Sequence, residues 1–184
     1  LPGLDLNESS YSIWLKWTHT DAWEAVLSSV DASDTSIELQ VNRRGDSLAN
    51  SAGDLVFLVQ DEDDNKWLGG TVGESFNDGE WHQIVWNVVS GTANDIDLYV
   101  DGVSVSTSTN EATNPDNFVP LLENVLLGAR NLDGSVSRYF NGTIDEVKVY
   151  NRSLTADEIK EDYIKGKLNY TFGGDQSLNN VDAN

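Results

Sequence analysis

Short runs of alternating apolar and polar residues, separated by polar turns, constrain the fold of this chain more than any other feature. Ile37, Leu39 and Val41 share one face of such a run, and a period of two is typical of a strand with one face in a core. The segment LYV-DG-VSV adds a hairpin, because Asp101-Gly102 supplies the two left-handed residues of a type I′ turn. Comparable runs lie at residues 11–17, 24–30, 36–42, 54–60, 67–71, 80–89, 95–100, 103–108, 125–128 and 143–150. The pattern predicts an all-β fold of two antiparallel sheets, a β-sandwich.

One short helix is predicted near the C-terminus, in the segment SLTADEIKEDYIKG. Thr155 and Glu158 have the spacing of a capping box, in which each side chain bonds to the backbone N–H of the other residue. Ile159 and Tyr163 lie four residues apart on one face, and Gly166 is placed to end the helix. The helix is expected to cover one edge or end of the sandwich.

A length of 184 residues fits one domain. We assign residues 1–172 to this domain and residues 173–184 to a tail or linker. The segment LNYTFGGDQ at 168–176 reads as a further strand, which either completes this domain or begins another. No apolar stretch of 18 residues is present, so no membrane insertion by this segment is expected. The start at Leu1, with no signal-like segment, reads as a piece of a longer protein.

The composition is strongly acidic. Eleven Lys and Arg stand against 31 Asp and Glu, which gives a net charge of −20. Nucleic acid and anionic membranes are therefore poor partners, because such a surface repels them. Two explanations account for the acidity: a halophilic or marine source, where acidic and lysine-poor surfaces hold water in strong salt, or a calcium-rich extracellular module. We favour a halophilic origin for the bulk charge, with a local cation site added to it.

Three blocks of sequence stand out by their order and spacing. They are DGEWHQIVW at residues 78–86, IDLYVDGVSV at 96–105 and FNGTIDEVKVYNRSLTADEI at 140–159. Together they resemble the laminin-G-like family of concanavalin-A-like sandwiches. The resemblance implies a jelly-roll fold with one concave sheet, glycans, proteins or other surface ligands as partners, and often a structural calcium ion. The chain departs from the family at the N-terminus, where the usual first strand and its polar turn are missing.

Asp145 is the candidate calcium ligand that the sequence singles out. In TIDEVKVY, strict alternation puts Asp145 on the face of Val147 and Val149, and a carboxylate among apolar residues needs a cation or several hydrogen-bond donors. The alternatives are a calcium ligand and a carboxylate that caps backbone N–H groups, and the resemblance favours calcium. The acidic loops add the candidate metal ligands Asp61, Asp63 and Asp133, although such loops are also typical of solvated turns.

Six tryptophans raise the question of carbohydrate binding, because pyranose faces stack on indole rings. Trp81 and Trp86 are expected in the core. Trp14 alternates away from Ile13 and Leu15, toward the outer surface of its sheet. The candidate ligand-binding residues are Trp14, Trp23 and Trp67, each of which has core packing as the alternative.

Catalysis is not expected. The chain has two histidines and no cysteine, and no serine lies in a G-x-S-x-G motif. The predicted function is a non-catalytic extracellular or cell-surface binding module that recognises glycans, with possible calcium assistance. The alternative is a structural or adhesive domain of a filament, stalk or virion fibre, which contacts surface proteins or assembles with itself. A polysaccharide-degrading enzyme ranks below both, and would require two carboxylates in one cleft.

Overall fold

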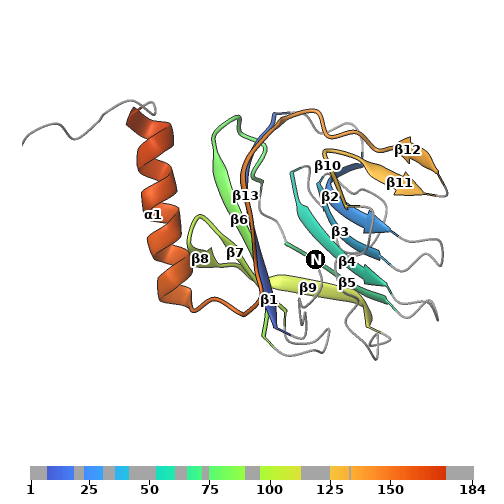
Figure 1. Ribbon diagram of the computed structural model, residues 1–184, viewed down its shortest axis with the longest axis horizontal. Coiled ribbons are helices and arrows are strands. Elements are labelled where there is room, and N and C mark those ends of the chain that lie inside the picture. The colour runs from blue at the N-terminus through green and yellow to red at the C-terminus, as the bar shows by residue number, and fades with distance from the viewer. Residues whose placement is uncertain are drawn as a thin grey trace, which may run out of the picture.

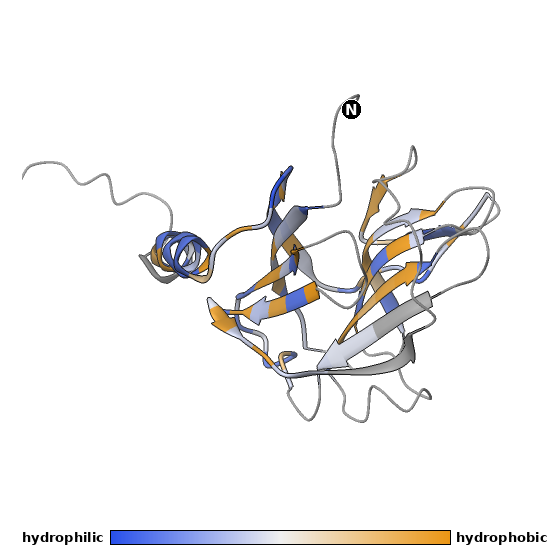
Figure 2. Cartoon of the chain, turned by 90° about the horizontal axis from the view of Figure 1, so that it is seen from below, coloured by the Kyte–Doolittle hydropathy of each residue, from blue (hydrophilic) through white to orange (hydrophobic). Residues whose placement is uncertain are grey.

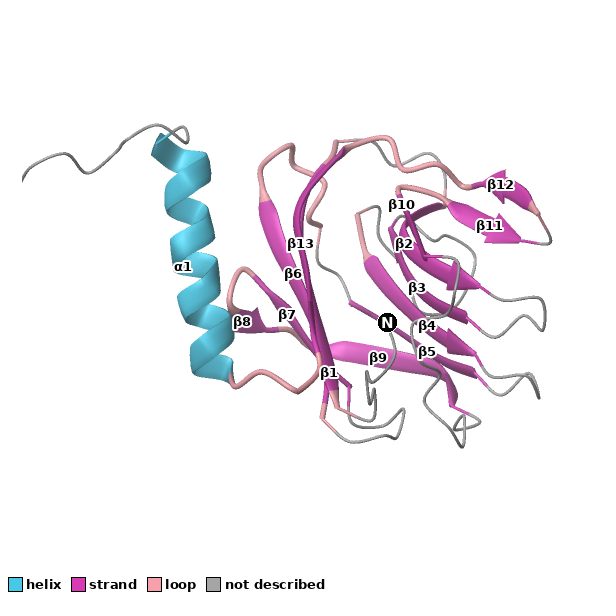
Figure 3. Ribbon diagram, in the orientation of Figure 1, coloured by secondary structure: helices cyan, strands magenta, loops and turns pink. Residues whose placement is uncertain are grey.

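The computed structural model is a β-sandwich with one helix, and it describes residues 8–18, 23–30, 36–41, 53–60, 66–71, 75–89, 96–112, 125–132 and 134–172 (Figures 1 and 3). The strands are β1 (Ser9–Lys16), β2 (Glu24–Val30), β3 (Ser36–Val41), β4 (Leu55–Gln60), β5 (Lys66–Thr71), β6 (His82–Val88), β7 (Ile96–Val100), β8 (Val103–Ser104), β9 (Thr107–Ala112), β10 (Val125–Leu127), β11 (Arg130–Leu132), β12 (Ser135–Ser137) and β13 (Thr143–Tyr150). The helix is α1 (Ala156–Phe172). The predicted all-β fold with one helix is confirmed.

Two antiparallel sheets face each other across one apolar core. Sheet A has the strand order β13-β1-β6-β7-β8, and sheet B has the order β10-β2-β3-β4-β5-β9. The predicted inward residues Ile37, Leu39 and Val41 are all 0 % exposed. Phe57 of sheet B meets Trp86 of sheet A edge-to-face, with 4.6 Å between ring centroids. Alternation in the sequence thus becomes a core filled from both sheets.

The predicted hairpin is present, and a second one was missed. Asp101 and Gly102 have φ values of 53° and 75°, as a type I′ turn between β7 and β8 requires. Strands β11 and β12 form another antiparallel pair within a segment that the sequence analysis left as loop. Its signal was the same Asp-Gly dipeptide, at residues 133–134.

Helix α1 lies against the outer face of sheet A and is longer than predicted (Figure 1). The capping box is confirmed, because Thr155 N–H donates to Glu158 at 2.9 Å and Glu158 N–H donates to Thr155 at 3.3 Å. Gly166 does not end the helix, which continues to Phe172, and residues 168–172 are therefore not a strand. Seen end-on in Figure 2, the helix is largely hydrophilic. Ile159, 0 % exposed, joins Val85 and Leu154 in a small second core beneath it.

A β-bulge interrupts the pairing of β13 with β1. Ser12 pairs with Lys148 and Trp14 pairs with Asp145, so β13 has one more residue than β1 between the two pairs. Glu146, with φ 48°, accommodates the extra residue in the left-handed region. Beyond this point the side chains of β13 exchange faces relative to simple alternation.

Candidate functional site

The bulge places Asp145 on the opposite face from the one predicted. Asp145 pairs with Trp14, whose side chain lies on the outer face of sheet A. Val149 pairs with Tyr11, whose side chain lies in the core between the sheets. Directly opposed residues of an antiparallel pair share a face. The predicted apolar register of Asp145 with Val147 and Val149 is therefore wrong, and the cause is the extra residue at Glu146.

Asp145 has protein partners on this outer face. Its Oδ1 accepts a hydrogen bond from the Glu146 N–H at 2.8 Å, and its side chain is exposed. Burial, followed by the neighbouring Asp145 carboxylate, raises the pKa of the Tyr170 hydroxyl. Within the described ranges, no group of three or more His, Asp or Glu side chains is arranged to hold a metal ion. Asp61, Asp63 and Asp133 lie outside the described residues, so the calcium site stays a prediction.

Trp14 faces outward as predicted, but the surface above it is not open. It is 1 % exposed, because α1 covers it. Tyr163 stacks on its ring with centroids 5.8 Å apart, and Tyr170 packs against it at 4.7 Å. The helix therefore occupies the place where a sugar would stack on Trp14. Trp67 belongs to β5, where its backbone pairs with Val59, and its side chain lies outside the described residues.

Trp23 lies in a more accessible environment, at the rim of the sandwich where β2 begins. The Arg138 guanidinium lies over the Trp23 ring, with Cζ 3.1 Å from the ring centroid. Both side chains are partly exposed, and the next residue, Tyr139, is 64 % exposed. We call Trp23, Arg138 and Tyr139 the Trp23 corner. Figure 1 shows the chain crossing the rim here, from β12 to the start of β13.

Backbone contacts fix the position of this corner. The Ala25 N–H donates to the Arg138 carbonyl at 2.9 Å, and Ala25 forms a parallel bridge with Tyr139. The Phe140 N–H donates to the Gly128 carbonyl at 2.9 Å, which closes the loop that carries the hairpin. Arg138 itself has φ 53°. A non-glycine residue in this region is strained by about 1–3 kcal/mol, and such residues concentrate at binding sites.

A buried ion pair anchors the hairpin to sheet B. Arg130 of β11 lies 2.9 Å from the Glu38 carboxylate, which is 0 % exposed on the outer face of β3. Gln40 donates to the same carboxylate at 2.8 Å. Ser28 of β2 donates to the Ala129 carbonyl at 2.8 Å. These polar contacts replace the apolar packing that usually covers a sheet, and they hold the segment that leads to Arg138 and Tyr139.

The Trp23 corner brings an exposed aromatic ring and a cation together. The exposed Tyr139 ring offers a flat apolar face to a sugar, and its hydroxyl donates to the Val136 carbonyl at 3.1 Å, which holds the ring in place. The guanidinium stacked on the indole adds a planar cation, a group type that proteins use to recognise hydroxyl and carboxylate oxygens. The sequence analysis named Trp23 as a candidate but not its neighbours Arg138 and Tyr139, because only the folded hairpin brings them to it; the ligand-binding role of Trp23 stays a prediction.

Two acids of α1, Glu158 and Asp162, are held by neighbouring side chains. Hydrogen bonds from Arg152 and from the Thr155 backbone lower the pKa of Glu158 to about 2. A general acid needs a pKa near or above neutrality instead. Asp162 is held by Lys148 at 2.9 Å and by Gln83 at 2.8 Å.

Comparison with known proteins assigns the fold. The family model described as the concanavalin A-like lectin/glucanases superfamily matches residues 2–160. The chain belongs to this superfamily. The resemblance seen in the sequence is thereby confirmed, and the match ends within the first half of α1. A search of curated protein sequences finds no match.

Solved structures that are similar to this chain include carbohydrate-binding and receptor-binding domains. The Ruminococcus gnavus IT-sialidase CBM40 aligns with TM-score 0.64 and 19 % identity over 87 % of this chain and 84 % of that one. The same CBM40 bound to α2,3 sialyllactose aligns with TM-score 0.63 and 19 % identity, over 85 % of this chain and 83 % of that one. The receptor-binding domain of botulinum neurotoxin type G aligns with TM-score 0.56 and 10 % identity, over 87 % of this chain and 38 % of that one. At these identities the likeness shows the fold alone. No helix in the described part of the chain is long and apolar enough to cross a membrane.

Proposed function

We propose that this superfamily member is a non-catalytic glycan-binding module, and that the Trp23 corner is its binding surface. The observation that carries the proposal is the Arg138–Trp23 stack beside Tyr139, which is 64 % exposed. It combines an exposed flat aromatic face with a cationic polar group, the pairing by which proteins orient a sugar ring. The CBM40 structures in complex with sialyllactose support a glycan as the ligand of this fold.

Location and calcium assistance belong to the same proposal. The module acts at the surface of a cell or virion, or in a secreted protein, of a halophilic or marine organism. The net charge of −20 supports the high-salt environment. Calcium would be held by the acidic loop residues, with Asp61, Asp63 and Asp133 as the candidate ligands besides Asp145.

The test is glycan binding by wild type and three variants. A panel of immobilised glycans that includes sialyllactose identifies a ligand, and calorimetry then measures its affinity. Tyr139→Ala and Arg138→Ala are expected to weaken binding at least tenfold, about 1.4 kcal/mol. Val103→Ala is the matched control, because Val103 is also 64 % exposed but lies on β8. Wild-type affinity in both corner variants would refute the assignment of the site.

A protein-contact role is the second candidate. Helix α1 covers sheet A, and the outward residues Ser28, Glu38 and Gln40 of sheet B are each 0 % exposed. In contrast, Val147 and Val149 of the edge strand β13 are 37 % and 42 % exposed. An exposed apolar edge strand is a site for pairing with another chain. Concentration-dependent self-association in light scattering, without binding to any glycan, would favour this role.

A further inference from the structure

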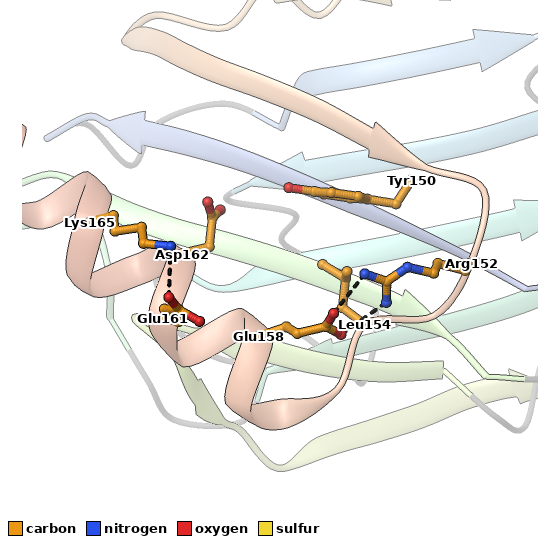
Figure 4. Close-up of a pocket in the computed structure, with 7 residues that line it drawn as sticks. All are labelled: Tyr150, Arg152, Leu154, Glu158, Glu161, Asp162 and Lys165. Atoms are coloured by element: carbon orange, nitrogen blue, oxygen red, sulfur yellow. Dashed lines mark hydrogen bonds and ion pairs between the residues drawn. The ribbon is translucent and has the colours of Figure 1, made fainter.

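A pocket separate from the Trp23 corner lies between the end of β13 and the first half of α1 (Figure 4). Its volume is about 210 Å³. Tyr150 forms one wall, with its ring lying flat along the pocket in Figure 4, and buried Leu154 lies beneath. The remaining lining residues are charged: Arg152, Glu158, Glu161, Asp162 and Lys165. The pocket therefore has one aromatic face and otherwise polar walls.

Each of these charges already has an opposite charge within reach. Arg152 holds Glu158 through two hydrogen bonds, of 2.7 and 2.9 Å. Lys165 pairs with Glu161 at 2.7 Å. Asp162 is paired from outside the pocket with Lys148 at 2.9 Å, and this ammonium also lies 3.6 Å from Glu146. An ionic ligand of either sign would have to displace one of these partners, whereas a neutral ligand would not.

Hydrogen-bonding capacity nevertheless remains on the pocket walls. Asp162 accepts from the Lys148 ammonium and from Gln83, and a carboxylate offers about four lone-pair sites. Arg152 uses donors on Glu158 and on the Ser153 carbonyl, out of five N–H groups. Burial, and then the charge of Asp162, raises the pKa of Tyr150, so its hydroxyl stays protonated at neutral pH. The pocket thus offers acceptors and donors on groups whose charges are already paired.

We propose that this pocket binds one neutral pyranose ring, stacked on Tyr150 and hydrogen-bonded to Asp162 and Arg152. A neutral ring with one apolar face and several hydroxyls matches a flat aromatic wall among paired charges. The volume, about 210 Å³, is smaller than the roughly 300 Å³ at which pockets for drug-sized ligands begin, so it fits a single ring rather than a chain.

The site is distinct from the Trp23 corner and does not depend on it. The corner leads into the start of β13 at Thr143, and the pocket begins at its end, Tyr150. The seven residue steps from Thr143 to Tyr150 correspond to roughly 23 Å of strand. Figure 1 likewise shows the start of α1 at the other end of β13 from the chain segment that crosses the rim. Two sites on one module would strengthen its attachment to a polysaccharide through avidity.

The test is saturation-transfer NMR with the methyl glycosides of glucose, galactose and mannose, applied to the wild-type chain. At least one of them is expected to bind, with shifts of the Tyr150 ring signals. Tyr150→Leu keeps the apolar packing but removes the flat face, and should weaken binding at least tenfold. Val125→Ala, which changes a 45 % exposed residue of β10 outside both sites, should leave it unchanged. Thermal melting verifies that both variants are folded. Binding should not change with ionic strength, because no charge is exchanged.

The opposite outcomes would overturn the proposal. These are no binding of any of the three glycosides, equal binding by folded Tyr150→Leu, or tighter binding of acetate or butylamine than of the glycosides. Should Tyr150→Leu fail to fold, Arg152→Lys replaces it, since it keeps the charge but loses the forked donor set. If Tyr139→Ala loses pyranoside binding and Tyr150→Leu does not, the binding occurs at the Trp23 corner. That result would refute the pocket proposal and leave the proposed function standing.

Discussion

Replacing Gly166 by alanine tests the docking of α1 on sheet A. In an exposed helix this change stabilises by about 1 kcal/mol, because glycine is a poor helix former. Here a Cβ on Gly166 would lie closest to Cζ2 of Trp14, 2.8 Å from its Cε2 and 3.0 Å from its Nε1. Real Cβ atoms do not approach other atoms so closely, and the indole is 1 % exposed with Tyr163 and Tyr170 against it. The ring therefore has no space into which to move.

The magnitude follows from the two opposing effects. Overpacking a filled site costs about 1–3 kcal/mol, and contact with several atoms of a confined ring places this case at the upper end. Subtracting the helix-propensity gain of about 1 kcal/mol leaves a net destabilisation of about 2 kcal/mol. For a chain of 184 residues, each kcal/mol corresponds to about 2–4 °C in Tm. We expect Gly166→Ala to lower Tm by about 4–8 °C in calorimetry.

Two controls separate docking from helix propensity. Asn169→Ala changes an exposed residue of the same helix and should raise stability by about 0.5 kcal/mol. Combining Gly166→Ala with Trp14→Leu should remove most of the penalty, because the smaller side chain leaves room for the methyl group. If Gly166→Ala alone raised Tm as the control does, the helix would not lie against Trp14 and the reasoning would be refuted.

Three further predictions concern the charged groups. Burial alone would lower the pKa of His82, but hydrogen bonds and charge from Asp101 and Asp78 outweigh burial and raise the pKa above 6.5. The stability that protonated His82 adds to the fold is therefore complete below pH 6.5 and is lost as pH rises through the raised pKa. The Tm difference between wild type and His82→Gln, measured across this range, should shrink with increasing pH, and a constant difference would contradict it. Glu38→Gln leaves Arg130 buried without a counter-charge and should cost about 3–5 kcal/mol in urea unfolding, whereas a cost below about 1 kcal/mol would show that the ion pair is solvated. If Asp145 binds calcium, Asp145→Ala should lower Tm in calcium but change little in excess chelator; identical melting in both buffers would exclude the metal role.

The sandwich itself could be predicted because its signals are local. A period of two identifies a strand such as β3 from six residues, and Asp-Gly identifies the β7–β8 turn. The capping box of α1 likewise depends on residues three apart. The family resemblance rests on these same local blocks, which explains why it held over most of the chain.

The candidate site could be predicted only in part. Trp23 was a candidate because of its residue type, but Arg138 and Tyr139 reach it through a hairpin that the Glu38–Arg130 pair anchors across long sequence separation. Trp14 was placed on the correct face, yet nothing near it in sequence shows that α1 covers it. Which surface remains accessible depends on how distant segments pack.

By itself, the amino-acid sequence determined the strands, the tight turn, the start of the helix and the acidic surface, because each follows from side-chain periodicity, backbone preference or charge within a few residues. The tertiary structure decided the face of Asp145, the role of Gly166 and the accessibility of the aromatic rings. The bulge at Glu146 exists only in register with β1. Position 166 of the helix requires glycine because Trp14 fills the space that a Cβ would take. Register and close packing are properties of paired segments, and neither segment carries them alone.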